Sequence, residues 1–232
     1  MHQAAGNNLV SVILFGSAAA GDFHPQSSDV NLFCILRDSS FSALQSIATV
    51  VKWWVKQKQP PPLFMTRDEV ERSADVFSIE FLDIQQNHRL VFGDDIIRDL
   101  KIPTSLHRMQ VEYELREKLA LLRQHLLIAV GDDKRMWELM TRSISSFATL
   151  FRHALMVMGR AAPPGKREAV EALAEVVGFD ASGFLQVLDA KASGANRGTL
   201  DTTAVFSRYL AAVEQVTAAV DRMQDSGDKG SS

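Results

Sequence analysis

The chain contains 232 residues, of which 46% are hydrophobic and 23% are charged, and its formal net charge is −3. This composition is typical of a globular protein with a sizeable buried core, and without a basic excess it gives no support for a nucleic-acid partner. The single cysteine, Cys34, excludes an internal disulfide. No run reaches the roughly 18–20 apolar residues that a membrane helix needs, and the N-terminus lacks a signal-peptide pattern, so we expect a cytoplasmic protein with no membrane attachment.

The first third of the chain alternates between strand and helix patterns. Residues 1–8 are polar and small, so we expect a frayed end with no helix before the first strand. Val10–Phe15 and Val30–Leu36 are rich in Val, Ile, Leu and Phe, which predicts two buried strands. Between Phe41 and Lys58 apolar residues recur at helical spacing, and Asp38, Ser39 or Ser40 can cap the helix that this spacing predicts.

Three consecutive prolines at 60–62 forbid a longer helix and favour an extended segment over Leu63–Met65. Thr66 and Glu69 have the spacing of a capping box, which predicts a short helix to about Ser73. The β-rich run at 77–84, FSIEFLDI, predicts a further strand. Residues 1–102 are therefore expected to form a compact α/β unit.

From Pro103 onward every recognisable element is helical, and residues 103–224 are expected to form a bundle of four or five antiparallel helices. We expect His153, in the second of these helices, to be a satisfied interhelical histidine. The tail at 225–232 is polar and rich in Gly and Ser, which predicts disorder. The fold class is thus α+β, a small mixed-sheet core followed by an all-α helical bundle. The expected helices cover residues 104–130, 132–158, 167–177, 182–192 and 200–223.

The segment between the first two strands has a pattern suited to phosphate chemistry. Gly16-Ser17 directly follows the first strand, and a small-residue turn at a strand end leaves backbone N–H groups free for phosphate oxygens. Asp29 enters the second strand, where a carboxylate can hold a metal ion beside those phosphates. Asp29 and Asn31 are two residues apart and should share one face of the strand.

This stretch resembles the signature of the nucleotidyltransferase superfamily, the DNA polymerase β-like proteins: an apolar strand, Gly-Ser, about ten residues, then Asp-apolar-Asp-apolar. In this chain the last part is Asp29-Val30-Asn31-Leu32, with an amide in place of the second Asp. The helical second domain resembles the bundle of nucleotidyltransferases of the kanamycin and streptomycin type. The first strand starts early for such a fold, which suggests a short version or a trimmed N-terminus.

The resemblance implies roles for eight residues. Asp29, Asn31 and Glu80 would hold Mg²⁺, with Asp29 and Glu80 catalytic; Glu80 would act as general base or metal ligand, and Asp83 is its alternative. A nucleoside triphosphate would be held by residues in both predicted domains. These nucleotide-binding candidates are Gly16, Ser17, Ser28, Arg142 and Lys166.

Asn31 decides how we interpret the function. Replacing Asp by Asn keeps an oxygen donor but removes a negative charge, and losing one such electrostatic contact commonly costs two to three orders of magnitude in rate. We therefore expect transfer of a nucleoside monophosphate, AMP first, from a triphosphate to a small-molecule or protein hydroxyl, with weakened or lost catalysis. The alternative is a non-catalytic module that senses nucleotide or binds a partner. A homodimer is open as well, because related enzymes complete their clefts across a subunit boundary.

Overall fold

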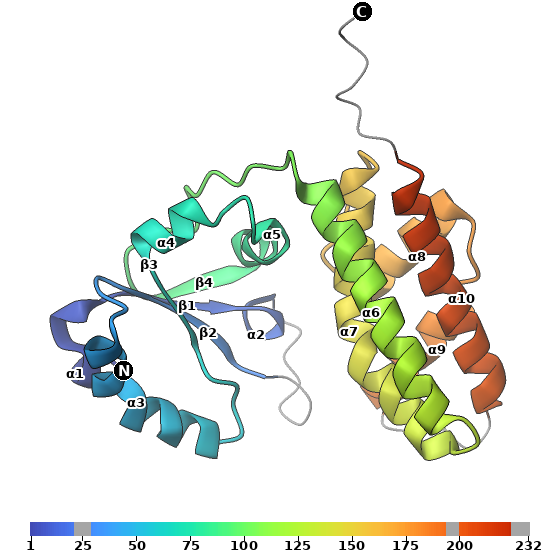
Figure 1. Ribbon diagram of the computed structural model, residues 1–232, viewed down its shortest axis with the longest axis horizontal. Helices are drawn as coiled ribbons and strands as arrows, with labels where there is room; N and C mark the ends of the chain where they lie inside the picture. The colour runs from blue at the N-terminus through green and yellow to red at the C-terminus, as the bar shows by residue number, and fades with distance from the viewer. Residues whose placement is uncertain (21–28, 194–199, 224–232) are drawn as a thin grey trace, which may run out of the picture. The chain divides into compact units, whose positions relative to one another are not determined.

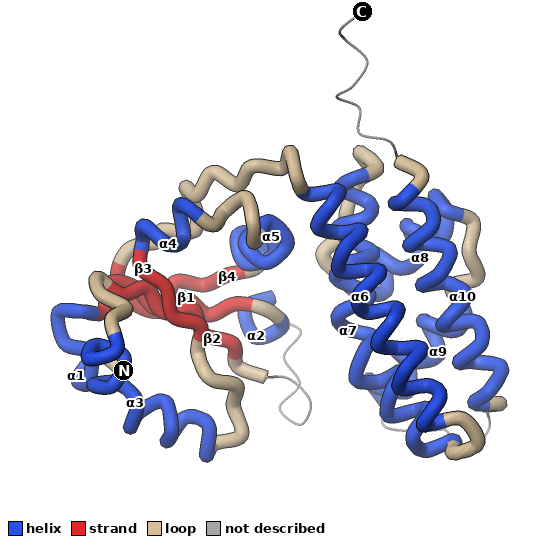
Figure 2. The backbone as a smooth tube through the Cα atoms, in the orientation of Figure 1, coloured by secondary structure: helices blue, strands red, loops and turns tan. Residues whose placement is uncertain are grey.

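The computed structural model describes residues 1–20, 29–193 and 200–223, and the chain divides into two compact units, Met1–Leu106 and His107–Ser232 (Figure 1). The first unit combines a sheet with helices and the second is helical, which confirms the expected α+β class (Figure 2). No helix among the described residues is both long and apolar enough to cross a membrane.

The first unit is built on a four-stranded mixed sheet with the strand order β3-β2-β1-β4. β1 is antiparallel to both β2 and β4, and β2 is parallel to β3. The helices of this unit precede β1 or connect successive strands. The strands are β1 (Leu9–Phe15), β2 (Asn31–Leu36), β3 (Leu63–Thr66) and β4 (His88–Gly93), and the helices are α1 (His2–Ala5), the 3₁₀ turn η1 (Gly6–Asn8), α2 (Ser17–Ala20), α3 (Phe41–Lys56), α4 (Arg67–Arg72) and α5 (Ser78–Gln86).

Each face of this sheet has its own hydrophobic cluster, because alternate residues of a strand point to opposite sides. On one face Ile13, Phe33 and Ile35 pack with residues of α4, α5 and the segment after β4. On the other face Val12, Cys34 and Leu36 pack with Ile47 of α3 and with α1. The near-continuous apolar sequence of β1 and β2 follows from this burial on both faces.

The strand predicted at 77–84 is wrong, because these residues form the N-cap and most of α5. Ile79 and Phe81 are both buried, while Glu80 between them is exposed. A short apolar run fits a buried helix as well as a strand, so only packing against the sheet decides between them. The fourth strand is instead β4, which the sequence prediction missed.

The predicted frayed N-terminus is also wrong, because α1 precedes β1. Met1, Ala4 and Ala5 pack against the hydrophobic cluster on the α3 side of the sheet. The Asn8 side chain accepts a hydrogen bond from Asp38 N at 2.8 Å and donates one to Asp38 O at 3.0 Å. Tertiary contacts thus order a segment with little local helix-forming tendency.

The second unit contains five helices among its described residues: α6 (His107–Ala129), α7 (Asp133–Val157), α8 (Lys166–Val177), α9 (Ser182–Ser193) and α10 (Thr202–Asp221). Aromatic rings fill its core, with Phe184 stacked on Tyr209 at 4.1 Å and Phe147 edge-on to both. His153 is fully buried and its Nδ1 lies 3.1 Å from Nε2 of His107 on α6, which confirms the expected interhelical histidine. The predicted disordered tail lies outside the described residues.

Candidate functional site

Asn31, one of the predicted site residues of the first unit, lies beside the C-terminal end of β1. Phe15, the last residue of β1, pairs with Asn31 of β2 on one side and with His88 of β4 on the other. Neighbouring strands lie about 4.8 Å apart, so Asn31 and His88, two strands apart, are separated by about 10 Å. The His88 side chain contacts Asp95, whose Oδ1 lies 2.9 Å from Nε2 of the imidazole.

Gly16 directly follows this row of the sheet and lies against Asn31. Its φ of +74° is in the left-handed region, and its carbonyl oxygen accepts a hydrogen bond from Ala19 N at 3.0 Å, which closes the turn into α2. A Cβ placed on Gly16 would lie 3.0 Å from Nδ2 of Asn31. A glycine is therefore favoured at this position for two reasons: the positive φ angle, and the closeness of the Asn31 side-chain amide.

Asp29 lies two residues before Asn31 and is exposed. β2 begins only at Asn31, so the alternation of strand faces does not extend to Asp29. The backbone is held in place one residue later, where Val30 N donates a hydrogen bond to Oε1 of Gln59 at 2.8 Å. Asp29 thus directly precedes Val30, whose backbone is held by Gln59, and lies two residues before the start of β2.

Glu80 belongs to helix α5, which packs on the sheet. Asn31 shares its strand face with Phe33, and Phe81 of α5 stacks on Phe33 with the ring centroids 6.2 Å apart. α5 therefore covers the face of the sheet to which Asn31 points, and Glu80 is an exposed residue in the first turn of that helix. Its suggested role as base or metal ligand stays a prediction.

The remaining predicted residues are Ser17, Ser28, Arg142 and Lys166. Ser28 lies outside the described residues, and Ser17 is the first residue of α2. Arg142 and Lys166 belong to the second unit, on α7 and α8. Nζ of Lys166 donates a hydrogen bond to Oγ of Ser145 at 3.3 Å. The roles of these four residues in phosphate binding stay predictions.

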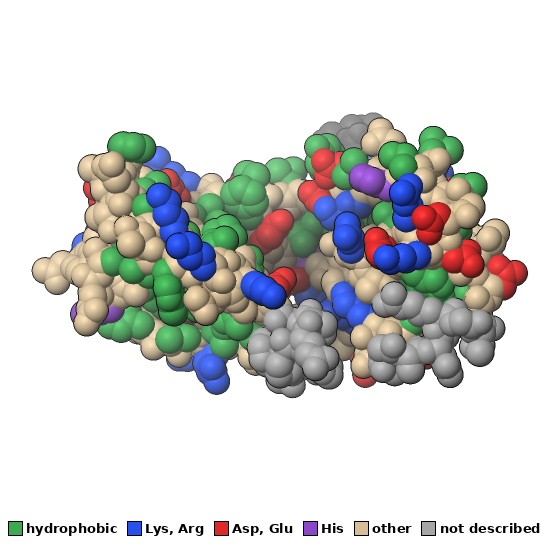
Figure 3. Space-filling model, turned by 90° about the horizontal axis from the view of Figure 1, so that it is seen from below, with side chains coloured by type: hydrophobic (Ala, Val, Ile, Leu, Met, Phe, Trp, Pro, Cys, Tyr) green, Lys and Arg blue, Asp and Glu red, His purple; other side chains and the backbone are tan. Residues whose placement is uncertain are grey.

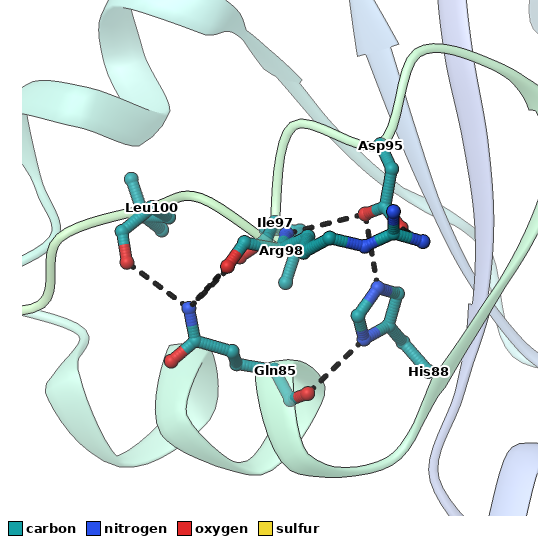
Figure 4. A network of polar contacts seen from close by, with 6 residues as sticks. All are labelled: Gln85, His88, Asp95, Ile97, Arg98 and Leu100. Carbon is teal, nitrogen blue, oxygen red and sulfur yellow. Dashed lines mark hydrogen bonds and ion pairs between the residues drawn. The ribbon is translucent and has the colours of Figure 1, made fainter.

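A polar network at the start of β4 was missed from the sequence (Figure 4). Nε2 of His88 lies 2.9 Å from Oδ1 of Asp95, and Nδ1 lies 3.2 Å from the carbonyl oxygen of Gln85. Both oxygens only accept hydrogen bonds, so both ring nitrogens donate when the imidazole is protonated. The Gln85 amide also donates to three carbonyl oxygens of the segment after β4, those of Ile97, Arg98 and Leu100.

Asp95 is the acidic centre of this network. Burial raises the pKa of its carboxyl, but the hydrogen bond from His88, the Arg98 backbone N–H at 3.2 Å and the two positive charges outweigh burial and lower that pKa below its usual value. The network thus fastens the segment after β4 to the end of α5. A histidine opening a short β-rich run, followed within ten residues by Asp, was the only signal in the sequence.

Asp29 and Asn31 carry side-chain oxygen atoms of the kind that Mg²⁺ binds. Among the residues that the structure describes, no three His, Cys, Asp or Glu side chains gather as metal ligands. Asp29 offers a carboxylate and Asn31 an amide oxygen, and Mg²⁺ commonly binds through one or two carboxylates while water and substrate phosphates complete its shell. These two residues would hold such an ion.

Comparison with known proteins gives one finding about the family. No curated protein matches the chain. Residues 4–84 match a family model, the nucleotidyltransferase domain, and domains of this kind generally use a nucleoside triphosphate and a divalent metal ion. The matched range runs from α1 into α5 and includes Gly16, Asp29, Asn31 and Glu80. It supports the assignment of the first unit to the nucleotidyltransferase superfamily.

Proposed function

We propose that the first unit binds a nucleoside triphosphate at the end of β1 and that the protein is a weak nucleotidyltransferase, with AMP the first candidate for the transferred group. The acceptor would be a hydroxyl of a small molecule or a protein. The observation that carries the proposal is the contact of Gly16 with Asn31 at the end of one strand row, inside the range that matches a nucleotidyltransferase domain.

The chemistry requires positioning and charge neutralisation more than covalent help from the protein. The acceptor oxygen attacks the α-phosphorus, a new P–O bond forms, and the bond to the β-phosphate oxygen breaks to release pyrophosphate. Backbone N–H groups of the turn at Gly16 would hold phosphate oxygens, and Asp29 would hold the ion that neutralises them. Glu80 would accept the proton of the acceptor hydroxyl or serve as a further ligand.

A second candidate function follows from Asn31. An amide there carries no negative charge, so a site with Asp29 alone can bind a nucleotide without efficient transfer. The protein would then be a sensor of nucleotide, or a module that binds a partner, on the same fold. Binding and turnover must therefore be measured separately.

The test is to restore the missing carboxylate. Binding and turnover of ATP, GTP, CTP and UTP are measured with and without magnesium, in the wild type and in Asn31→Asp. We expect the variant to turn over about 100- to 1,000-fold faster, because one electrostatic contact at a reacting phosphate has about this effect on rate. Asn7→Asp is the matched control, since residue 7 precedes β1 at the opposite end of the sheet and is exposed.

Three outcomes separate the candidate functions. Turnover by the wild type that Asp29→Ala abolishes would identify an enzyme that tolerates Asn31. Turnover that arises only in Asn31→Asp, with nucleotide binding in the wild type, would identify the sensor. The nucleotide proposal fails if neither protein binds any of the four triphosphates.

A further inference from the structure

The helical unit contains a pocket of its own between α6 and α7. Its volume is about 440 Å³, within the range of about 300–1,000 Å³ that is usual for small-molecule sites. All its lining residues that the structure describes belong to these two helices. They are Lys118, Leu121, Leu122, His125, Ile128, Ala129, Arg135, Glu138, Leu139, Arg142, Ser143, Ser146 and Phe147.

The floor of this pocket is apolar. Leu122, Ala129 and Phe147 are buried, while Leu121 and Ile128 are 44% and 71% exposed. When a ligand covers exposed apolar side chains, the free energy of binding becomes more favourable by about 25 cal/mol for each Å² of apolar surface removed from water. An occupant should therefore have an apolar body.

The charges around the pocket are mostly positive, with Lys118, Arg135 and Arg142 against the single acid Glu138. Figure 3 looks onto the end of the helical unit where α6 leads into α7, and basic, acidic and apolar side chains are all visible there. Two of the three cations already have partners. Lys118 pairs with Glu114 at 2.8 Å, and Arg135 pairs with Asp132 at 3.2 Å.

Arg142 differs from these two cations. It is exposed, and it makes no hydrogen bond or ion pair with any residue that the structure describes. A guanidinium carries five N–H donors in a planar fork that matches an acidic group, so Arg142 has its full donor set available. A charged donor at the edge of an apolar floor matches a ligand with an acid group at one end.

We propose that this pocket binds a small organic anion with an apolar body, whose acid group contacts Arg142 and whose body lies against Leu122, Leu139 and Phe147. The proposal does not depend on nucleotide binding by the first unit. It commits to an amphiphilic acid, such as a carboxylate on an aliphatic chain. Inorganic phosphate has no apolar body, and a neutral apolar molecule makes no use of Arg142.

The test uses the full chain and the fluorescence of 1-anilinonaphthalene-8-sulfonate, a dye with an aromatic body and an acid group. We expect saturable binding that decanoate displaces at least tenfold more effectively than decanol, which has the same chain length and no charge. We also expect the affinity to fall as salt rises, because exposed charges are screened within about 8–10 Å at 0.10–0.15 M salt.

Variants place the binding in this pocket. Arg142→Gln should weaken dye binding about three- to tenfold, the range for one charge-assisted hydrogen bond at a partly exposed site. Arg123→Gln is the matched control, since Arg123 is an exposed arginine of α6 that pairs with Glu214 and does not line the pocket. Ile128→Glu adds a negative charge at an exposed lining position and should weaken binding at least as much.

The outcomes decide the proposal in either direction. A loss in Arg142→Gln that Arg123→Gln does not share, together with preference for decanoate, supports it. Equal effects of the two arginine variants, equal displacement by decanol and decanoate, or no saturable binding each overturn it. Circular dichroism of each variant shows whether the helices are intact, and Ile128→Glu gives an independent reading should Arg142→Gln fold poorly.

Discussion

Two glycines of the first unit share a backbone angle and differ in what surrounds them. Gly16 has a φ of +74° and Gly93 a φ of +76°. A Cβ on Gly16 would meet the end of the Asn31 side chain at 3.0 Å, whereas a Cβ on Gly93 would lie 1.8 Å from the backbone oxygen of Val10. The first contact can relax by a small movement of an amide, and the second cannot relax without moving β1.

This difference predicts unequal costs for the same substitution. Gly16→Ala should lower the free energy of unfolding by about 1–2 kcal/mol, the cost of a left-handed residue with a Cβ. Gly93→Ala should lower it by about 3 kcal/mol or more, because a backbone clash is added to the same angle. Urea unfolding followed by tryptophan fluorescence measures both, and equal losses would show that the close approach to Val10 has no cost.

At the scale of the element, the segment after β4 is fastened to α5 by polar contacts as well as by apolar burial. The Asp95 side chain is only 12% exposed and receives hydrogen bonds from His88 and from Arg98 N. Ile96 and Ile97 of the same segment are buried in the cluster on the α5 face. The carboxylate therefore holds in place a segment whose side chains complete a core.

Replacing this carboxylate should change how stability depends on pH. The pKa of Asp95 is lower in the folded chain than in the unfolded one, so its contribution is present above the unfolded pKa and is lost as the pH falls through the folded pKa. Asp95→Asn should cost about 1–2 kcal/mol at pH 7 and less as the pH falls below about 4. Urea unfolding at a series of pH values measures this.

Asp99→Asn serves as the control for this experiment, because Asp99 is an exposed acid of the same segment. It should leave the stability at pH 7 nearly unchanged. If the two variants lose stability equally, or if the loss in Asp95→Asn does not shrink in acid, the role given to the carboxylate is wrong.

At the scale of the whole molecule, the chain consists of two units with separate cores. The helical unit buries its own aromatic residues, including Phe147, Phe151, Phe184 and Tyr209. The Trp137 indole donates to Oγ1 of Thr202 at 3.0 Å and so joins α7 to the N-terminal residue of α10. A unit with these internal contacts has what an independently folding domain requires.

We therefore predict that residues 107–232 fold when expressed alone. The fragment should show a helical circular dichroism spectrum and a cooperative thermal transition, because its buried aromatic and aliphatic residues pack on one another. A spectrum without cooperative melting would mean that the helical unit needs the first unit for its stability, and the units would then count as one folding domain.

Much of the local structure could be predicted because it depends on neighbours in the chain. The capping box of Thr66 and Glu69 is present, with Glu69 N donating to Oγ1 of Thr66 at 3.2 Å and Thr66 N donating to the Glu69 carboxylate at 2.6 Å. Asp132 caps α7, and its side chain accepts a hydrogen bond from Arg135 N at 3.1 Å. Both involve residues three apart, within which a side chain satisfies an open backbone N–H.

The candidate site was predictable in part. Gly16 and Asn31 follow from a strand, a turn and a second strand, and the sheet brings them together. The place of Glu80 could not be derived, since the run at 77–84 fits either a buried strand or a buried helix. The helix is favoured by the packing of Phe81 on Phe33 of β2, which lies 48 residues earlier in the sequence.

The sequence by itself determined the α+β class, the helical second half and the glycine-serine turn between two apolar strands, because periodicity, capping and turn chemistry act over a few residues. Only the tertiary structure decided that 77–84 is a helix, that β4 is the fourth strand, and that His88 meets Asp95. Those choices depend on which distant residues share a core, and burial energies between distant segments outweigh the small differences in local propensity.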